Sequence, residues 1–104
     1  MEASQVSGNT QVAIPTEKTL ISAAKLAVKY DKPILLDYYN DSINNRACIG
    51  LCNNNDKVII KSKDEYTSPI QNIFKVNEDY IGVTENSVYI LSVNIKTKKL
   101  NLNI

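Results

Sequence analysis

From residue 33 onward the chain is built of short apolar runs separated by clusters of asparagine, aspartate, serine and lysine. The runs cover residues 34–39, 46–52, 57–61, 70–76, 80–84, 88–95 and 99–104. Runs of this length, joined by turns this short, are typical of antiparallel strands. The pattern predicts a mainly β body of six or seven strands, arranged as an antiparallel meander that forms a small barrel or a strongly bent sheet.

One helix precedes these runs. Thr16 is a suitable N-cap, and Glu17 lies where the helix dipole favours negative charge. Pro33 limits the helix, because the residue before a proline avoids helical backbone angles. The apolar stripe at helical spacing consists of Leu20, Ile21, Ala24, Ala27 and Val28. We expect this stripe to pack on the sheet, which makes the predicted class α+β.

The 104 residues are enough for one domain that buries a core of its own. Residues 1–14 are polar and lack periodicity, so we expect a flexible arm followed by a single domain at 15–104. We expect no secretory leader, because the residues after Met1 are not apolar, and no apolar run approaches the ~20 residues that span a bilayer. The expected location is therefore intracellular, without membrane association.

Few residue combinations suggest catalysis. The chain contains no histidine, and its three glycines are isolated. Asp37 lies inside a predicted strand, either as an outward-facing carboxylate or as a buried acid. Cys48 and Cys52, with Arg46 nearby, are too far apart along a strand for a disulfide and lack the partners of a zinc site. We expect free thiols, no metal, no cofactor and no enzymatic activity.

Several residues are candidates for binding a partner. The longest polar connection contains Asp64, Glu65, Tyr66 and Ser68, and long ordered loops often carry function. Basic side chains gather in two places: Lys57, Lys61 and Lys63 alternate on one face of a predicted strand, and Lys96, Lys98 and Lys99 form a second group. Together with the tyrosines they suit a small nucleic-acid-binding barrel, although lysines also protect sheet edges from aggregation. Since the net charge is only +1, we expect generic nucleic acid to bind weakly, at about 10⁻⁴ M or worse.

The C-terminal residues Leu100, Leu102 and Ile104 alternate with polar residues and suggest a final strand with one apolar face. Such a strand must close a barrel or leave an open edge that pairs with a neighbour. The sequence therefore predicts a homo-oligomer, most simply a two-fold dimer.

Three stretches, residues 32–39, 65–70 and 84–90, resemble small proteins of large nucleocytoplasmic DNA viruses. The resemblance covers roughly residues 20–95 and implies a virion component or a host-interaction module, located in the host cytoplasm or the virion. It implies no activity or site residue. The sequence as a whole predicts a non-enzymatic structural or protein-interaction module, with a nucleic-acid-binding small barrel as the alternative.

Overall fold

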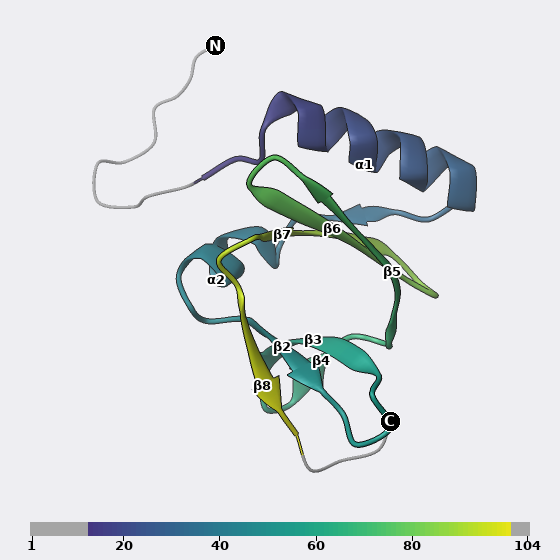
Figure 1. Cartoon of the computed structure of the whole chain (residues 1–104). Coiled ribbons are helices and arrows are strands. Elements are labelled where there is room, and N and C mark those ends of the chain that lie inside the picture. Colours follow the sequence, from purple (N-terminus) through teal and green to yellow (C-terminus); the bar gives the residue numbers. More distant parts are fainter. Residues whose placement is uncertain (1–12, 101–104) are drawn as a thin grey trace.

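The computed structural model describes residues 13–100 (Figure 1). Its elements are α1 (Glu17–Tyr30), β1 (Ile34–Leu35), α2 (Tyr39–Ile43), β2 (Cys48–Leu51), β3 (Lys57–Ser62), β4 (Glu65–Tyr66), β5 (Ile70–Val76), β6 (Asp79–Thr84), β7 (Val88–Ser92) and β8 (Lys96–Lys99). Within this part of the chain, the eight strands form two four-stranded sheets. Sheet A has the order β1-β7-β6-β5 and sheet B the order β4-β3-β2-β8. The α+β class is as predicted.

The predicted single meander or barrel is wrong, because each sheet contains two neighbouring strands that are far apart in the sequence. β1 pairs parallel with β7, and β8 pairs parallel with β2, so both sheets are mixed and neither closes into a barrel. Antiparallel pairing through short turns is confirmed for β2–β3 and for β5–β6–β7. Local turn signals predicted these hairpins, whereas the two parallel pairings depend on contacts between distant segments.

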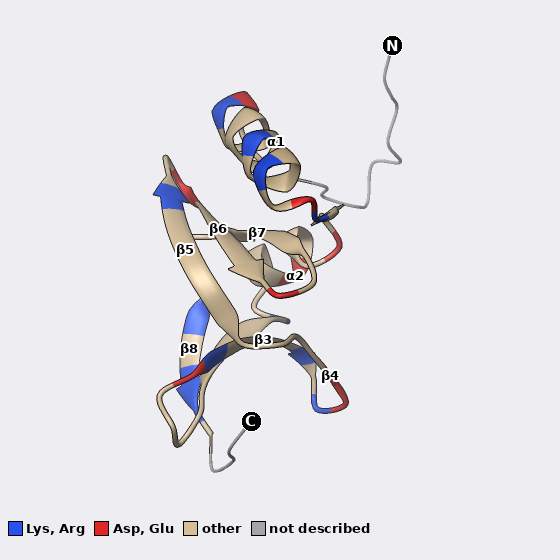
Figure 2. Ribbon diagram, turned by 90° about the vertical axis from the view of Figure 1, so that its right-hand side faces the viewer, with Lys and Arg blue, Asp and Glu red and all other residues tan. Residues whose placement is uncertain are grey.

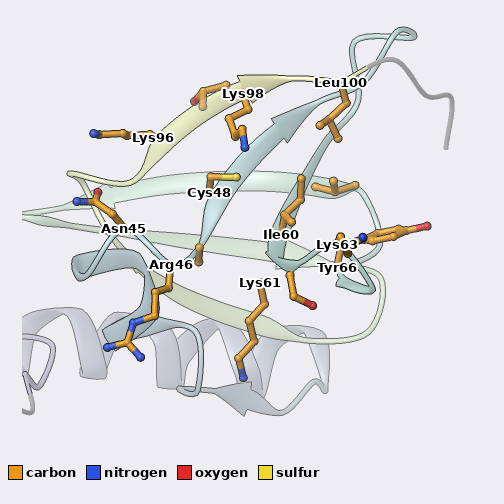
Figure 3. Close-up of a pocket in the computed structure, with 14 residues that line it drawn as sticks. Asn45, Arg46, Cys48, Ile60, Lys61, Lys63, Tyr66, Lys96, Lys98 and Leu100 are labelled. Carbon is orange, nitrogen blue, oxygen red and sulfur yellow. The ribbon is translucent and has the colours of Figure 1, made fainter.

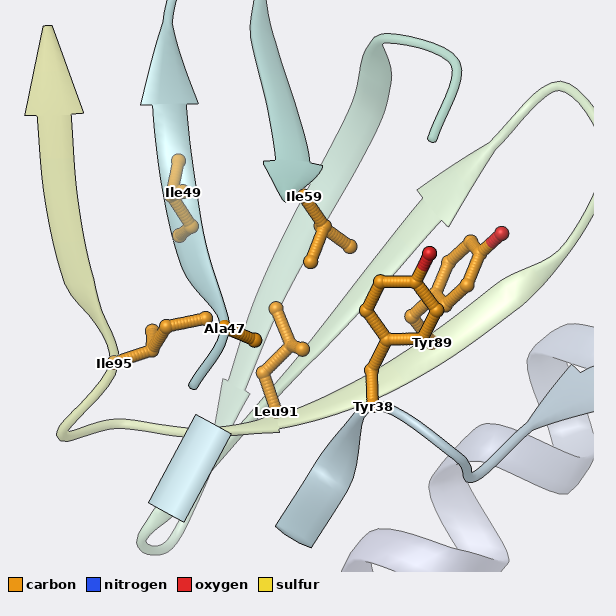
Figure 4. Packing of buried hydrophobic residues seen from close by; sticks show 7 residues of the cluster. All are labelled: Tyr38, Ala47, Ile49, Ile59, Tyr89, Leu91 and Ile95. Carbon is orange, nitrogen blue, oxygen red and sulfur yellow. The ribbon is translucent and has the colours of Figure 1, made fainter. Parts of the chain in front are cut away.

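The molecule has three layers: α1, sheet A and sheet B (Figure 1). Strands β6 and β7 lie at the centre and are buried on both faces. On β7, Val88 and Ile90 belong to the apolar cluster beneath α1, while Tyr89 and Leu91 belong to the cluster between the sheets. Figure 4 shows this second cluster, where Ile49 and Ile59 of sheet B meet Leu91 of sheet A.

Helix α1 begins and ends as predicted. The Thr16 side chain accepts a hydrogen bond from the Thr19 backbone N–H, and Asp31 adopts a left-handed conformation at the C-cap. The predicted apolar stripe is only partly buried, however. Leu20 and Ala27 pack on the cluster below, whereas Ile21 and Val28 are 51% and 83% exposed. The helix is rotated so that Thr19 faces inward.

The rotation follows from a buried carboxylate at the start of β6. Asp79 is 1% exposed and accepts hydrogen bonds from the Thr19 hydroxyl at 2.7 Å and the Tyr39 hydroxyl at 2.8 Å. The backbone N–H of Thr16 also points at it, at 3.4 Å. Because buried charges need several polar partners, Asp79 joins α1, α2 and sheet A at one point.

Two segments differ from the sequence prediction. The run at 34–39 divides into the two-residue strand β1 and the start of α2. Residues 96–98, expected as a turn between two predicted strands, belong with Lys99 to β8. In the predicted arm, Ala13 is bound to α2: its N–H donates to Asn40 Oδ1 at 3.0 Å. The prediction of a flexible arm otherwise lies outside the described residues. Among residues 13–100, no helix is long and apolar enough to cross a membrane.

Candidate functional site: a basic groove on sheet B

The two faces of sheet B differ in what covers them. The inner face packs on sheet A, whereas the outer face is hollowed by a groove of about 680 Å³, which we call the basic groove (Figure 3). This volume lies within the range of ligand-binding pockets. Its lining consists of Asn45, Arg46, Ala47, Cys48, Val58, Ile60, Lys61, Ser62, Lys63, Tyr66, Lys96, Thr97, Lys98 and Leu100.

The floor of the basic groove is apolar. Cys48, Val58 and Ile60 come from the central strands β2 and β3. Leu100 continues the pairing of β8 with β2 through its N–H, which donates to Leu51 O at 2.8 Å. It lies over Gly50, where an added Cβ would come within 2.6 Å of Leu100 Cδ1 and 2.5 Å of Ile60 Cδ1. The absence of a side chain at Gly50 therefore lets Leu100 and Ile60 approach each other, which shapes the floor.

The rim is cationic. Five basic side chains and no aspartate or glutamate occur among the described residues that line the groove; the basic ones are Arg46, Lys61, Lys63, Lys96 and Lys98. The parallel register places Lys96 beside Cys48 and Lys98 beside Gly50, so both lysines follow one wall. Figure 2 shows the basic segments of β8 on this sheet, away from α1. Such a concentration of one sign attracts anions.

Lys61 differs from the other four cations. Its ammonium lies 3.4 Å from Asp37 and 3.9 Å from Asp41, and 5.3 Å from the centre of the Tyr38 ring. These contacts neutralise much of its charge and fasten β3 to the segment between β1 and α2. The other four cations form no ion pair with a described residue. Charge available for a ligand therefore comes from Arg46, Lys63, Lys96 and Lys98.

Local turns bring the remaining residues to the groove. Asn45 adopts a left-handed conformation that leads the chain from α2 into β2, which positions Arg46 at one end. At the other end the β3–β4 turn carries Lys63, and Tyr66 pairs with Ile60 across the sheet. Thr67 fixes this turn, since its hydroxyl accepts a hydrogen bond from the Ile59 N–H at 3.0 Å. Tyr66 remains 51% exposed.

The structure brings together only some of the nominated binding residues. Lys61, Lys63, Tyr66, Lys96, Lys98 and Leu100 line the groove. Asp64, Glu65, Lys57 and Lys99 are exposed outside it, and Ser68 accepts a hydrogen bond from Asn86 Nδ2 at 3.1 Å. Leu102 and Ile104 lie outside the described residues, so self-association through them stays a prediction. Sequence reasoning did not assign Cys48, Val58 and Ile60 to one floor, because no local signal reveals the outer face of a sheet.

The candidate catalytic residues have ordinary surroundings. Asp37 follows β1 and its side chain is 55% exposed, so the buried-acid interpretation is wrong. Cys48 and Cys52 are both free, as predicted, and only Cys52 is fully buried. No group of three or more potential metal ligands occurs among residues 13–100.

Tyrosines behind the groove are held in their neutral form. Tyr38 and Tyr89 pack edge to face with ring centres 5.2 Å apart (Figure 4). Burial, and then the nearby negative charge of Glu65, raise the pKa of Tyr38 to about 12. Burial also raises the pKa of Tyr89. These rings are structural, which leaves Tyr66 as the aromatic residue of the groove.

No protein-family model, curated protein or solved structure matches this chain.

Proposed function

We propose that this protein is a non-enzymatic binding module that holds an anionic ligand in the basic groove. The observation that carries the proposal is the rim of cations without a lining carboxylate, set above an apolar floor. An ion-pair network that served folding alone would place acids among these cations, as occurs at Lys61. Arg46, Lys63, Lys96 and Lys98 instead leave their charge for a partner.

The chemistry of the side chains that line the groove supports binding of a ligand and not its chemical conversion. Its ionisable side chains are lysines, one arginine, one cysteine and one tyrosine, which supply positive charge and hydrogen-bond donors. Asp37 and Asp41, which do not line the groove, form ion pairs with its Lys61. The resemblance to proteins of large DNA viruses supports a role for such a module in a virion or at a host partner.

A charge-reversal experiment tests the proposal. The variant Lys96→Glu/Lys98→Glu reverses one wall of the groove, and Lys18→Glu/Lys25→Glu is its matched control on the exposed face of α1. Both variants change the net charge by the same amount. Binding of a labelled heparin oligosaccharide, measured by fluorescence anisotropy at low ionic strength, should weaken at least about tenfold in the first variant and much less in the control.

Two results would refute the proposal. Equal weakening in both variants would show that net charge, and not the groove, attracts the polyanion. Failure of the unmodified protein to bind heparin or any other polyanion would remove the ligand class altogether.

A further inference from the structure

Resting on the proposed function, we infer that the anionic ligand is a single-stranded nucleic acid. Its phosphates would lie against Lys96, Lys98 and Lys63, and a base would stack on Tyr66. The inference comes from three features of the groove: the strands that form its floor, the exposed aromatic ring at one end, and the distribution of the cations.

The floor excludes the commonest way in which a sheet binds a peptide. An extended peptide adds to a free sheet edge through backbone hydrogen bonds. Cys48, Val58 and Ile60 lie on β2 and β3, which are the two central strands of sheet B, and the ladders with their neighbours use their backbone groups. An acidic peptide lying along the floor would therefore gain none of the backbone hydrogen bonds that strand addition provides.

A nucleic-acid strand does not meet that difficulty. Its backbone has no amide groups to satisfy, its phosphates need cations, and its bases and sugars offer apolar surface. Lys96 and Lys98 are two residues apart on one strand, so their side chains leave the sheet on the same side. They form a row of charge along β8 that can follow a strand of phosphates.

Tyr66 supplies the stacking surface. Tyr66 lies opposite Ile60 in the antiparallel ladder, which places its ring on the face of the sheet that carries the floor. Figure 3 shows Tyr66 and Arg46 at opposite ends of the groove, with Cys48 and Lys98 between them. A half-exposed ring beside Lys63 is the arrangement used by proteins that bind single strands without sequence preference.

Stacking on Tyr66 requires a base whose face is open, and this requirement favours a single strand over a duplex. In a duplex the faces of the bases are stacked on one another, and a base must leave the stack before a protein can use its face. A single strand offers its faces without that cost. Stacking is tolerant of base identity, so homopolymeric oligothymidylate is a suitable probe.

The test compares three labelled probes of about 12 units, within the usual site size of such proteins. They are oligothymidylate, an abasic phosphodiester with the same number of phosphates, and oligoglutamate. Anisotropy titrations at several salt concentrations use the unmodified protein, Tyr66→Ala and Tyr66→Phe. Circular dichroism checks that each variant keeps its fold, which the exposure of Tyr66 favours.

The unmodified protein should bind oligothymidylate roughly five- to 100-fold more tightly than the abasic probe. Tyr66→Ala should abolish that preference, and Tyr66→Phe should keep it. Equal affinity for oligothymidylate and the abasic probe, tightest binding of oligoglutamate, or an unchanged preference in Tyr66→Ala would overturn the nucleic-acid inference but leave anion binding standing. Binding of none of the three probes would overturn the proposed function as well.

Discussion

The two sheets contain four strands each, yet they are covered differently. Sheet A is enclosed by α1 on one face and by sheet B on the other, and its central strands β6 and β7 are buried throughout apart from Tyr80. Sheet B buries Ile49 and Ile59 against sheet A but leaves its outer face to the basic groove. The comparison indicates that sheet A is covered on both faces, whereas sheet B has one face with a groove that is open to solvent, where we propose that a ligand binds.

The largest expected effect comes from truncating one isoleucine in each region. Ile90 is fully buried on β7, so Ile90→Ala should lower the free energy of unfolding by about 2–5 kcal/mol. Ile60 is half-buried on the groove floor, and Ile60→Ala should cost at most about 1.5 kcal/mol. Urea unfolding of both variants measures the difference. Equal costs would mean that the outer face of sheet B belongs to the core.

The next effect concerns the polar junction that holds α1 and α2 to sheet A. Tyr39→Phe removes a hydrogen bond to the buried Asp79 and should destabilise the protein by about 1–3 kcal/mol. Burial, and then the hydrogen bond with Asp79, raise the pKa of Tyr39 to about 12. Because the folded-state pKa is raised, the contribution of neutral Tyr39 is complete below pH ~10 and is lost as the pH rises through about 12.

Urea unfolding at pH 7 and at several values between about 10 and 12 tests this sign. The unmodified protein should lose stability over that interval, and Tyr39→Phe should lose less, with Tyr38 and Tyr89 accounting for the remainder. An identical pH profile in the two proteins would show that Tyr39 is not held neutral by the fold.

A smaller effect is expected from the charges on the rim. Lys96 and Lys98 are exposed and form no ion pair with a described residue, so Lys96→Glu/Lys98→Glu should change the unfolding free energy by only about 0.5 kcal/mol. Thermal unfolding at moderate salt measures it. A loss of several kcal/mol would show that these lysines hold the sheet together, and would weaken their assignment to a ligand.

The smallest expected difference is one of reactivity. Cys48 lies half-buried on the groove floor, whereas Cys52 is 2% exposed. A thiol reagent should modify Cys48 in the folded protein and Cys52 only in denaturant. Mass spectrometry of a non-reduced digest provides the check, and a Cys48–Cys52 link there would contradict the strand geometry.

Short sequence patterns predicted the elements that depend only on neighbouring residues. Strand β5 has the predicted bounds, and Thr16 caps α1 where expected. The incorrect predictions share a cause: each concerns a segment whose structure depends on residues far away along the chain. β8 is a strand because it pairs with β2, and Thr19 turns inward because Asp79, sixty residues later, needs a donor. A hydrophobic stripe cannot report a buried polar contact of that kind.

The candidate site shows the same limit. The two groups of lysines in the sequence include four cations of the rim, Lys61, Lys63, Lys96 and Lys98, since charge is visible in the sequence. The pattern did not show that Lys61 is engaged by Asp37, or that Lys57 lies outside the groove. The sequence places Arg46 only near Cys48, because its position beside the groove depends on the left-handed turn at Asn45.

The most direct test of whether the ligand binds on sheet B and not on sheet A is a titration of the isotope-labelled protein with oligothymidylate. The amide chemical shifts of the protein are monitored during the titration. We predict shift changes concentrated on β2, β3, β4 and β8, around Cys48, Ile60, Tyr66 and Lys98. The amides of α1, β5 and β6 should stay unchanged. Changes centred on α1 or the β5 edge would contradict the account and place the binding surface on sheet A.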